Sequence, residues 1–158
     1  MFYWQMMNAG KVRQLGLDVS ANIEKRWGND WTVSATGSYS YLSATDRTDL
    51  SELSYGDQIA YTPHHSGSAN ILIHSPWLDL GYNVLLMGER YTLGYNIPHN
   101  RMSAFTDHSI TLSREFNINR QQLRVQFDVR NLGNKNYEVV RFYPMPGTNW
   151  RLSVSWEL

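Results

Sequence analysis

The sequence predicts an all-β fold in which about eight strands follow one another as an antiparallel up-and-down meander. Three observations predict this fold. Apolar and polar residues alternate with a period of two along most of the chain, and helical periodicity is hard to find. Turn-prone segments separate the alternating stretches. With 158 residues, the chain is long enough for one domain of this kind.

The first strands are predicted on either side of a tight turn. Over residues 15–23 the odd-numbered positions are apolar and the even-numbered positions are polar or Gly. Residues 28–30, Gly-Asn-Asp, are types that accept positive φ in hairpin turns. Over residues 31–41 large or apolar residues again occupy the odd positions, opposite Ser and Thr. These stretches predict a hairpin, and residues 2–7 before it predict a partial strand.

The remaining strands continue the alternation. Residues 59–74 are less regular and include Pro63. Apolar and polar residues alternate over three shorter stretches and at the end of the chain: 80–86, 110–118, 123–129 and 150–158. Short linkers at 28–30, 75–77 and 119–121 alternate along the chain with long linkers at 45–57, 92–105 and 132–148. In a meander, all short linkers then fall at one end of the sheet and all long ones at the other. This asymmetry is typical of an outer-membrane β-barrel.

Aromatic residues make up 13% of the chain and gather at the predicted strand ends. One group lies near the short linkers or the chain end: Trp27, Trp31, Trp77, Phe116 and Trp156. A second group lies near the long loops: Tyr39, Tyr41, Tyr91, Phe105 and Trp150. Two belts separated by aliphatic positions fit the two interfaces of a membrane. A general preference of aromatic residues for strands explains their number but not their position.

The polar face of the predicted sheet is expected to line a hydrated lumen. It carries Ser, Thr, Asn, Asp, Arg and Gln, and Lys occurs only at positions 11, 25 and 135. Arg114 falls on the apolar face, so it is expected near an interface, beside a bulge, or against something other than lipid. Leu85 and Met87 point towards the lumen, which predicts that they pack against something inside.

Composition and motifs exclude several functions. The net charge of zero argues against a nucleic-acid-binding protein, which needs a basic field. The absence of Cys excludes disulfides and thiolate metal sites. Adjacent His64 and His65 would point to opposite faces of a strand, so no metal site is predicted. No catalytic constellation is found, and no cofactor is predicted.

The closing stretch NLGNKNYEVVRFYPMPGTNWRLSVSWEL, residues 131–158, resembles the C-terminal end of TonB-dependent outer-membrane receptors. The residues that carry the resemblance are Asn131-Leu132, Tyr137, Pro146-Gly147 and Trp150. Residues 8–21, with Gly16 and Asp18, and the stretch with Gly88, Arg90 and Tyr91 are also similar to family strands. The resemblance extends over essentially the whole chain.

The resemblance implies that residues 1–158 are the C-terminal segment of a transmembrane barrel of about 22 strands. No candidate for the plug domain is found in this chain. The implied function is import of a scarce nutrient, such as a ferric siderophore or cobalamin, across the outer membrane of a Gram-negative bacterium with energy from TonB, which would act through the plug region. Two alternatives stay open. One is a free-standing eight-stranded barrel, adhesive or structural, and the other is a soluble aromatic-rich carbohydrate-binding β-domain.

The outer loops contain the candidate ligand-binding residues, in which aromatic side chains occur together with Arg. They are Tyr95, His99, Arg101, Tyr137, Arg141, Phe142 and Tyr143. Such side chains suit stacking on, and hydrogen bonding to, a small molecule or metal chelate.

The final strand resembles the signal that the barrel-assembly machinery reads. Its apolar side would face membrane lipid and consists of Trp150, Leu152, Val154, Trp156 and Leu158. In the family this strand ends on an aromatic residue. Here the chain ends on Leu158, and the aromatic residue Trp156 lies two positions earlier.

Overall fold

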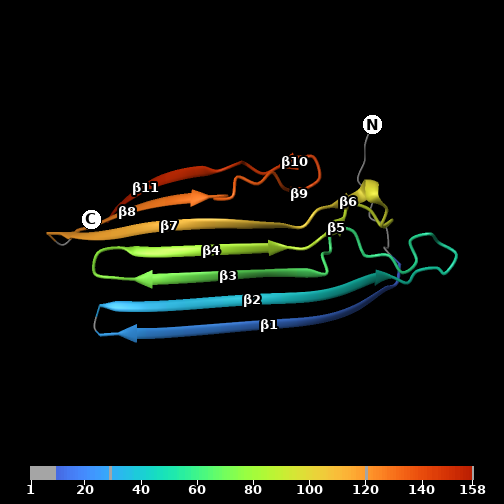
Figure 1. Ribbon diagram of the computed structural model, residues 1–158, viewed down its shortest axis with the longest axis horizontal. Coiled ribbons are helices and arrows are strands. Elements are labelled where there is room, and N and C mark those ends of the chain that lie inside the picture. The colour runs from blue at the N-terminus through green and yellow to red at the C-terminus, as the bar shows by residue number, and fades with distance from the viewer. Residues whose placement is uncertain (1–9, 29, 120, 158) are drawn as a thin grey trace.

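Seven long strands form one antiparallel sheet in the order in which they occur along the chain (Figure 1). The computed structural model describes residues 10–28, 30–119 and 121–157. The strands are β1 (Val12–Trp27), β2 (Trp31–Asp46), β3 (His65–His74), β4 (Asp79–Met87), β7 (Phe105–Ile118), β8 (Gln121–Arg130) and β11 (Asn149–Glu157). This arrangement confirms the predicted meander. The partial strand predicted at residues 2–7 lies outside the described residues.

The short and long connections lie at opposite ends of the sheet, as predicted (Figure 1). Gly28 and Asn119 have positive φ values of 64° and 49°, which the tight turns after β1 and β7 require. The long connections carry two small sheets, in which β5 (Arg90–Tyr91) pairs with β6 (Arg101–Met102) and β9 (Glu138–Val140) pairs with β10 (Tyr143–Pro144). A single 3₁₀ turn of the described residues, η1 (Pro98–Asn100), precedes β6.

Three predicted boundaries differ from the structure, the first by six residues and the other two by only two residues and one residue. The strand predicted over residues 59–74 begins only at His65, because Tyr61 adopts a positive φ of 57° and the preceding residues fold back on the end of β2. Thr45 belongs to β2 rather than to the long loop that follows it. Phe105 likewise belongs to β7, since it pairs with Met87 of β4.

The register aligns side chains of one kind across the whole sheet. One row runs through Ile23, Ala35, Ile71, Tyr82, Ile110, Val129 and Trp150. The adjacent row runs through Asn22, Thr36, Asn70, Asn83 and Ser109. Because neighbouring residues of a strand point to opposite faces, the sheet has an apolar face and a polar face. We call them the outer face and the inner face.

The described residues form a single layer with almost no core of their own. Only Ala44, Met102 and Phe105 are buried apolar residues in this part of the chain, whereas Ile23 on the outer face is 67% exposed and Trp150 is 71% exposed. A soluble sandwich would need a second sheet packed on the first. The other sheets of the described residues have two strands each and lie in the connections. The soluble β-domain is therefore not the fold that forms.

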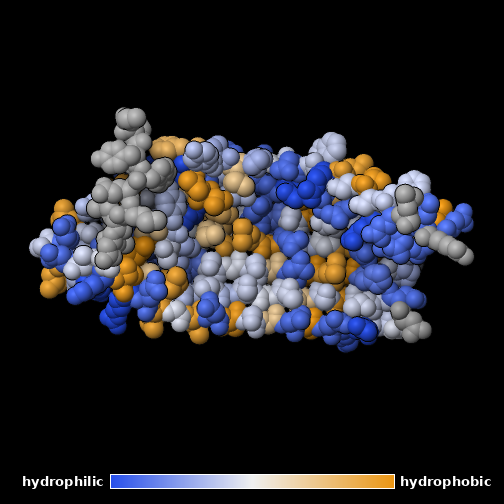
Figure 2. All heavy atoms as spheres, turned by 180° about the vertical axis from the view of Figure 1, so that it is seen from behind, coloured by the Kyte–Doolittle hydropathy of each residue, from blue (hydrophilic) through white to orange (hydrophobic). Residues whose placement is uncertain are grey.

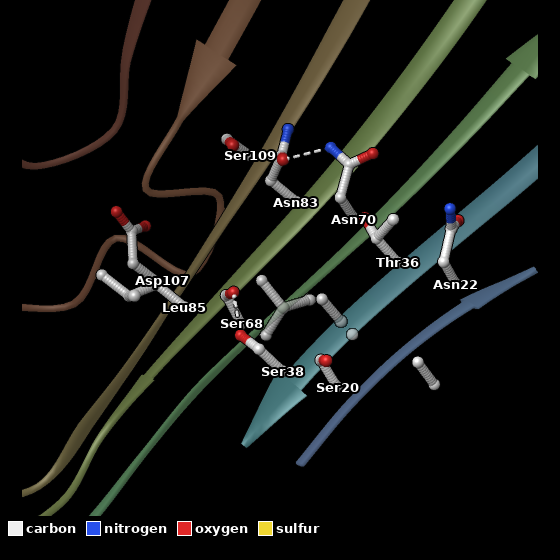
Figure 3. Close-up of a pocket in the computed structure, with 14 residues that line it drawn as sticks. Ser20, Asn22, Thr36, Ser38, Ser68, Asn70, Asn83, Leu85, Asp107 and Ser109 are labelled. Atoms are coloured by element: carbon white, nitrogen blue, oxygen red, sulfur yellow. Dashed lines mark hydrogen bonds between the residues drawn. The ribbon is translucent and has the colours of Figure 1, made fainter. Parts of the chain in front are cut away.

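The inner face is hollowed and polar. A hollow of about 650 Å³ crosses β1, β2, β3, β4 and β7, and its lining includes Ser20, Asn22, Thr36, Ser38, Ser68, Asn70, Asn83, Asp107 and Ser109. Figure 3 shows these side chains projecting from neighbouring strands into one space, with hydrogen bonds from Ser38 to Ser68 and from Asn70 to Asn83. Leu85 also lines the hollow, so it points inward as predicted. On the side turned away from the viewer in Figure 1, hydrophilic (blue) and intermediate (pale) residues lie along the middle, with scattered hydrophobic (orange) ones between them (Figure 2).

The sheet has two open edges. Within the described residues β1 pairs only with β2, and β11 pairs only with β8. A free-standing barrel would pair its first strand with its last, so the described strands do not close a barrel by themselves.

No helix of the described residues is long and apolar enough to cross a membrane.

Arg114 lies at the short-turn end of the outer face, in a regular part of the register opposite Val125. Its guanidinium donates a hydrogen bond to the Trp77 carbonyl in the turn after β3 and lies 5.3 Å from the centre of the Phe116 ring. The regular register excludes the predicted bulge, and the contacts with Trp77 and Phe116 place the guanidinium among aromatic residues at the short-turn end, as a position near an interface would require.

Candidate functional site

A groove of about 640 Å³ lies between two connections at the long-loop end of the sheet. One wall is formed by Arg101, Met102, Ser103, Ala104 and Phe105, and the other by Lys135, Asn136, Tyr137, Glu138, Arg141, Phe142 and Pro144. Four of the predicted ligand-binding residues therefore meet here: Arg101, Tyr137, Arg141 and Phe142.

The floor of the groove is an aromatic stack. The rings of Phe105 and Tyr137 lie 4.1 Å apart and nearly parallel. The Tyr137 hydroxyl donates a hydrogen bond of 2.8 Å to Oδ2 of Asp107, a residue that also lines the hollow of the inner face. Tyr137 therefore connects the loop that carries Arg141 to the wall of the barrel.

Burial, together with the hydrogen bond and negative charge of Asp107, raises the pKa of Tyr137 to about 12. A phenol has a pKa near 10 in an unfolded chain. A raised pKa means that the folded state favours the protonated phenol. Its contribution to stability is therefore complete below about pH 10 and is lost as the pH rises through about 12.

We expect Tyr137 to remain protonated at pH 11. The measurement is the difference in phenolate absorbance between the wild-type receptor and its Tyr137→Phe variant. This difference should be close to zero at pH 11 and should equal the absorbance of one tyrosinate above pH 12. A difference of one tyrosine that develops near pH 10 would contradict the burial of this hydroxyl.

Arg90 holds the wall of the groove that contains Glu138. Its side chain is almost completely buried, with 3% of the residue exposed, and burial lowers its pKa. Nη2 donates to the carbonyl oxygens of Glu138 at 2.5 Å and Val139 at 3.1 Å. The guanidinium lies 5.5 Å from the centre of the Phe105 ring. Arg90 thus connects β5 to β9.

The groove also has exposed side chains that a ligand could contact. Phe142 is 81% exposed and has a positive φ of 67°, and its amide donates to Oε2 of Glu138. The Arg141 guanidinium lies 5.5 Å from the Phe142 ring. Arg101 forms an ion pair of 2.5 Å with Glu89, so part of its charge is already balanced.

The other three predicted ligand-binding residues do not line the groove. Tyr95 and His99 lie in the connection between β5 and β6, where the Asn96 amide donates to Asp57 of the neighbouring loop. Tyr143 lies in β10 and is 72% exposed. The structure therefore divides the predicted residues into a group of four and three separate ones.

The loop before β11 is organised by Asn131, which is buried. Its side-chain amide donates to the carbonyl oxygens of Lys135 and Pro146, and its Oδ1 accepts a hydrogen bond from the Lys135 amide. A Cβ at Gly147 would lie 2.7 Å from Oδ1 of Asn134, so only glycine fits there without a shift. The Asn-Leu and Pro-Gly pairs noted in the sequence thus fold one loop.

The terminal strand β11 is held to its neighbours by the carboxylate of Asp128. This buried side chain accepts hydrogen bonds from Thr111 of β7, Gln126 of β8 and Arg151 of β11. Four predicted residues of the assembly signal, Trp150, Leu152, Val154 and Trp156, alternate along the outer face of β11. Leu158 lies outside the described residues.

Within residues 10–28, 30–119 and 121–157, no group of three or more His, Asp or Glu side chains is placed to hold a metal ion.

An open antiparallel sheet with one lipid-facing and one polar face, short turns at one end and long loops at the other is a wall segment of an outer-membrane barrel. A family model described as TonB dependent receptor-like, beta-barrel matches residues 2–132. The chain belongs to this family. No curated protein matches the chain.

Membership of this family implies a location in the outer membrane of Gram-negative bacteria, contact with membrane lipid and with TonB, and receptor-type transport. The family is one of transporters rather than enzymes. The match ends at Leu132, so it includes Asn131-Leu132 but not residues 133–158 of the closing stretch.

Several residues of the groove were not among the predicted ligand-binding residues. Phe105, Lys135 and Glu138 line it, and Arg90 supports it from below. The sequence did draw attention to Arg90, since it belongs to the stretch with Gly88 and Tyr91 that is similar to family strands. Lys135 and Glu138 had no such signal, because nothing local indicates which polar residues of a long loop turn towards a second loop.

Proposed function

We propose that residues 1–158 form the C-terminal barrel segment of a TonB-dependent receptor that imports a scarce nutrient as a small metal chelate, such as a ferric siderophore or cobalamin. The groove at the long-loop rim is the observation that supports this proposal. It has the size of a small-molecule site and combines stacked aromatic rings with basic side chains.

The charges in the groove favour an anionic ligand. Arg101, Lys135 and Arg141 line it together with a single acidic residue, Glu138. A guanidinium and an aromatic ring suit carboxylate, catecholate or hydroxamate groups around a bound metal ion. This chemistry favours the siderophore over the corrinoid within the proposed branch.

The remaining predicted partners fit the same proposal. The polar inner face would meet the plug, through which TonB would act. The alternating outer face of β11 would be read by the barrel-assembly machinery, and its open edge would pair with the first strand of the complete barrel.

We expect an Arg141→Ala, Phe142→Ala double variant of the receptor to bind a ferric tris-catecholate siderophore about 10 to 100 times more weakly than the wild type. The estimate combines one charge-assisted hydrogen bond with one cation–π or stacking contact. Quenching of intrinsic fluorescence during titration measures the affinity, and cyanocobalamin serves as the neutral comparison ligand.

Tyr95→Ala is the matched control, because Tyr95 is an exposed aromatic residue of the same rim that lies outside the groove. It should bind the siderophore like the wild type. Equal weakening by Tyr95→Ala and by the double variant would exclude the groove as the binding site.

A further inference from the structure

Acidic and basic side chains are distributed unequally between the two faces of the sheet. All acidic residues of the seven long strands lie on the inner face: Asp18, Glu24, Asp46, Asp79, Asp107, Glu115, Asp128 and Glu157. The outer face of these described strands carries Arg13, Lys25, His65, His108 and Arg114 and no carboxylate. A lipid-facing surface of this kind attracts anionic headgroups.

Most of the basic groups on the outer face are accounted for by contacts within the chain. Lys25 lies 4.9 Å from the centre of the Trp27 ring, and Arg114 bonds the Trp77 carbonyl, both at the short-turn end. His108 bonds the Tyr82 hydroxyl at 2.8 Å. At the long-loop end, by contrast, two basic side chains flank a hollow.

This hollow has a volume of about 360 Å³ and lies between β2 and β3 on one side and the start of β7 on the other. Tyr39, His65, Leu86, Thr106 and Lys135 are among its lining residues. Its walls are mainly apolar, and His65 and Lys135 are the basic residues among its lining.

One glycine of the lining, Gly88, leaves part of the hollow unfilled. A Cβ at Gly88 would be 2.6 Å from the His65 carbonyl oxygen. Because the two backbones approach so closely, no side chain at this position can fill the space. In the outer-face row, Gly67 separates two of the lining residues, Tyr39 and Leu86.

The two basic groups are held in place but retain free binding capacity. The Tyr39 hydroxyl and His65 Nδ1 are 2.7 Å apart, which leaves Nε2 as the second ring nitrogen. Lys135 Nζ donates to Thr106 Oγ1 at 3.0 Å and, as an ammonium group, carries two further protons. An oxyanion between them could accept hydrogen bonds from both sides.

We propose that this hollow binds the phosphate headgroup of a membrane lipid, with Lys135 and His65 on the phosphate and Leu86 against the start of an acyl chain. Long loops of outer-membrane barrels are extracellular, so the lipid belongs to the outer leaflet. The site faces the membrane and is distinct from the proposed nutrient-binding groove, although Lys135 lies beside both.

The test is histidine footprinting of the intact receptor in a neutral detergent, with phosphatidic acid or with diacylglycerol of the same acyl chains. Phosphatidic acid should slow the modification of His65 by diethyl pyrocarbonate at least threefold, whereas His108 should react equally in both lipids. In Lys135→Gln the lipid concentration needed for protection should rise about fivefold, as expected for one cation at a membrane surface.

Lys25→Gln is the matched control, since it removes a lysine from the same face at the opposite end. It should leave the protection of His65 unchanged. Heat-modifiable electrophoretic mobility checks that each variant is folded. Native mass spectrometry gives a second readout, in which His65→Gln should retain less phosphatidic acid than the wild type. Equal modification of His65 in both lipids, equal protection by inorganic phosphate alone, or equal loss in Lys25→Gln would overturn the proposal.

Discussion

Leu152→Arg is expected to destabilise the inserted barrel by about 2–4 kcal/mol, the cost of a charge near the middle of the lipid-facing surface. Leu152 lies halfway along β11, opposite Phe127, and is 58% exposed on the outer face. More than half of the residue is thus free of contacts within the chain, on the side expected to face lipid. Urea titration of the receptor refolded into phospholipid vesicles measures the loss.

Ser153→Arg is the matched control for this prediction. Ser153 is the next residue of β11, and it faces the polar inner side opposite Gln126. A cation there stays in a hydrated surrounding, so we expect a change below about 1 kcal/mol. Equal destabilisation by the two substitutions would show that the outer face has been assigned to the wrong set of residues.

Arg90→Leu is expected to release the loop that carries Arg141 and Phe142. The substitution removes the donor to the carbonyl oxygens of Glu138 and Val139, and a hydrogen bond to a charged group contributes about 1.5–3 kcal/mol. A local loss of about 3 kcal/mol speeds amide exchange roughly 100-fold. The amide of Met145, which donates to the Tyr137 carbonyl, is a suitable reporter for hydrogen exchange.

The control for this variant is Arg101→Leu, which removes a guanidinium from the opposite wall of the same groove. Arg101 is paired with Glu89, but its side chain is 56% exposed. Exposed ion pairs contribute at most about 1 kcal/mol, so exchange at Met145 should change little. If both variants speed the exchange equally, Arg90 does not hold the loop in the way its contacts indicate.

Most of the sheet could be predicted from the sequence because side-chain alternation is a local property of a strand. The odd positions of β1 and β2 and the even positions of β4 and β7 formed the outer face as expected. The wrong boundaries lie where the chain leaves this pattern. The start of β3 depends on the positive φ of Tyr61 and on backbone bonds to β2, which no alternation indicates.

The candidate groove could be predicted only in part. Aromatic residues and Arg in long loops indicated a binding rim, and Arg101, Tyr137, Arg141 and Phe142 do meet there. The same pattern also selected Tyr95, which belongs to a part of the rim that faces another loop. Composition alone does not distinguish the two, because the difference lies in how one loop packs on the next.

The class of fold, the family and the two faces of most strands could be inferred from residues that lie close together in the chain. Which distant residues meet could be seen only in the folded chain. Arg90 reaches Glu138, Tyr137 reaches Asp107, and His65 and Lys135 flank one hollow, all through contacts between separate strands and loops. These contacts depend on the register between strands and on the path of the loops. Both are set by pairings across the whole sheet, which a local pattern does not contain.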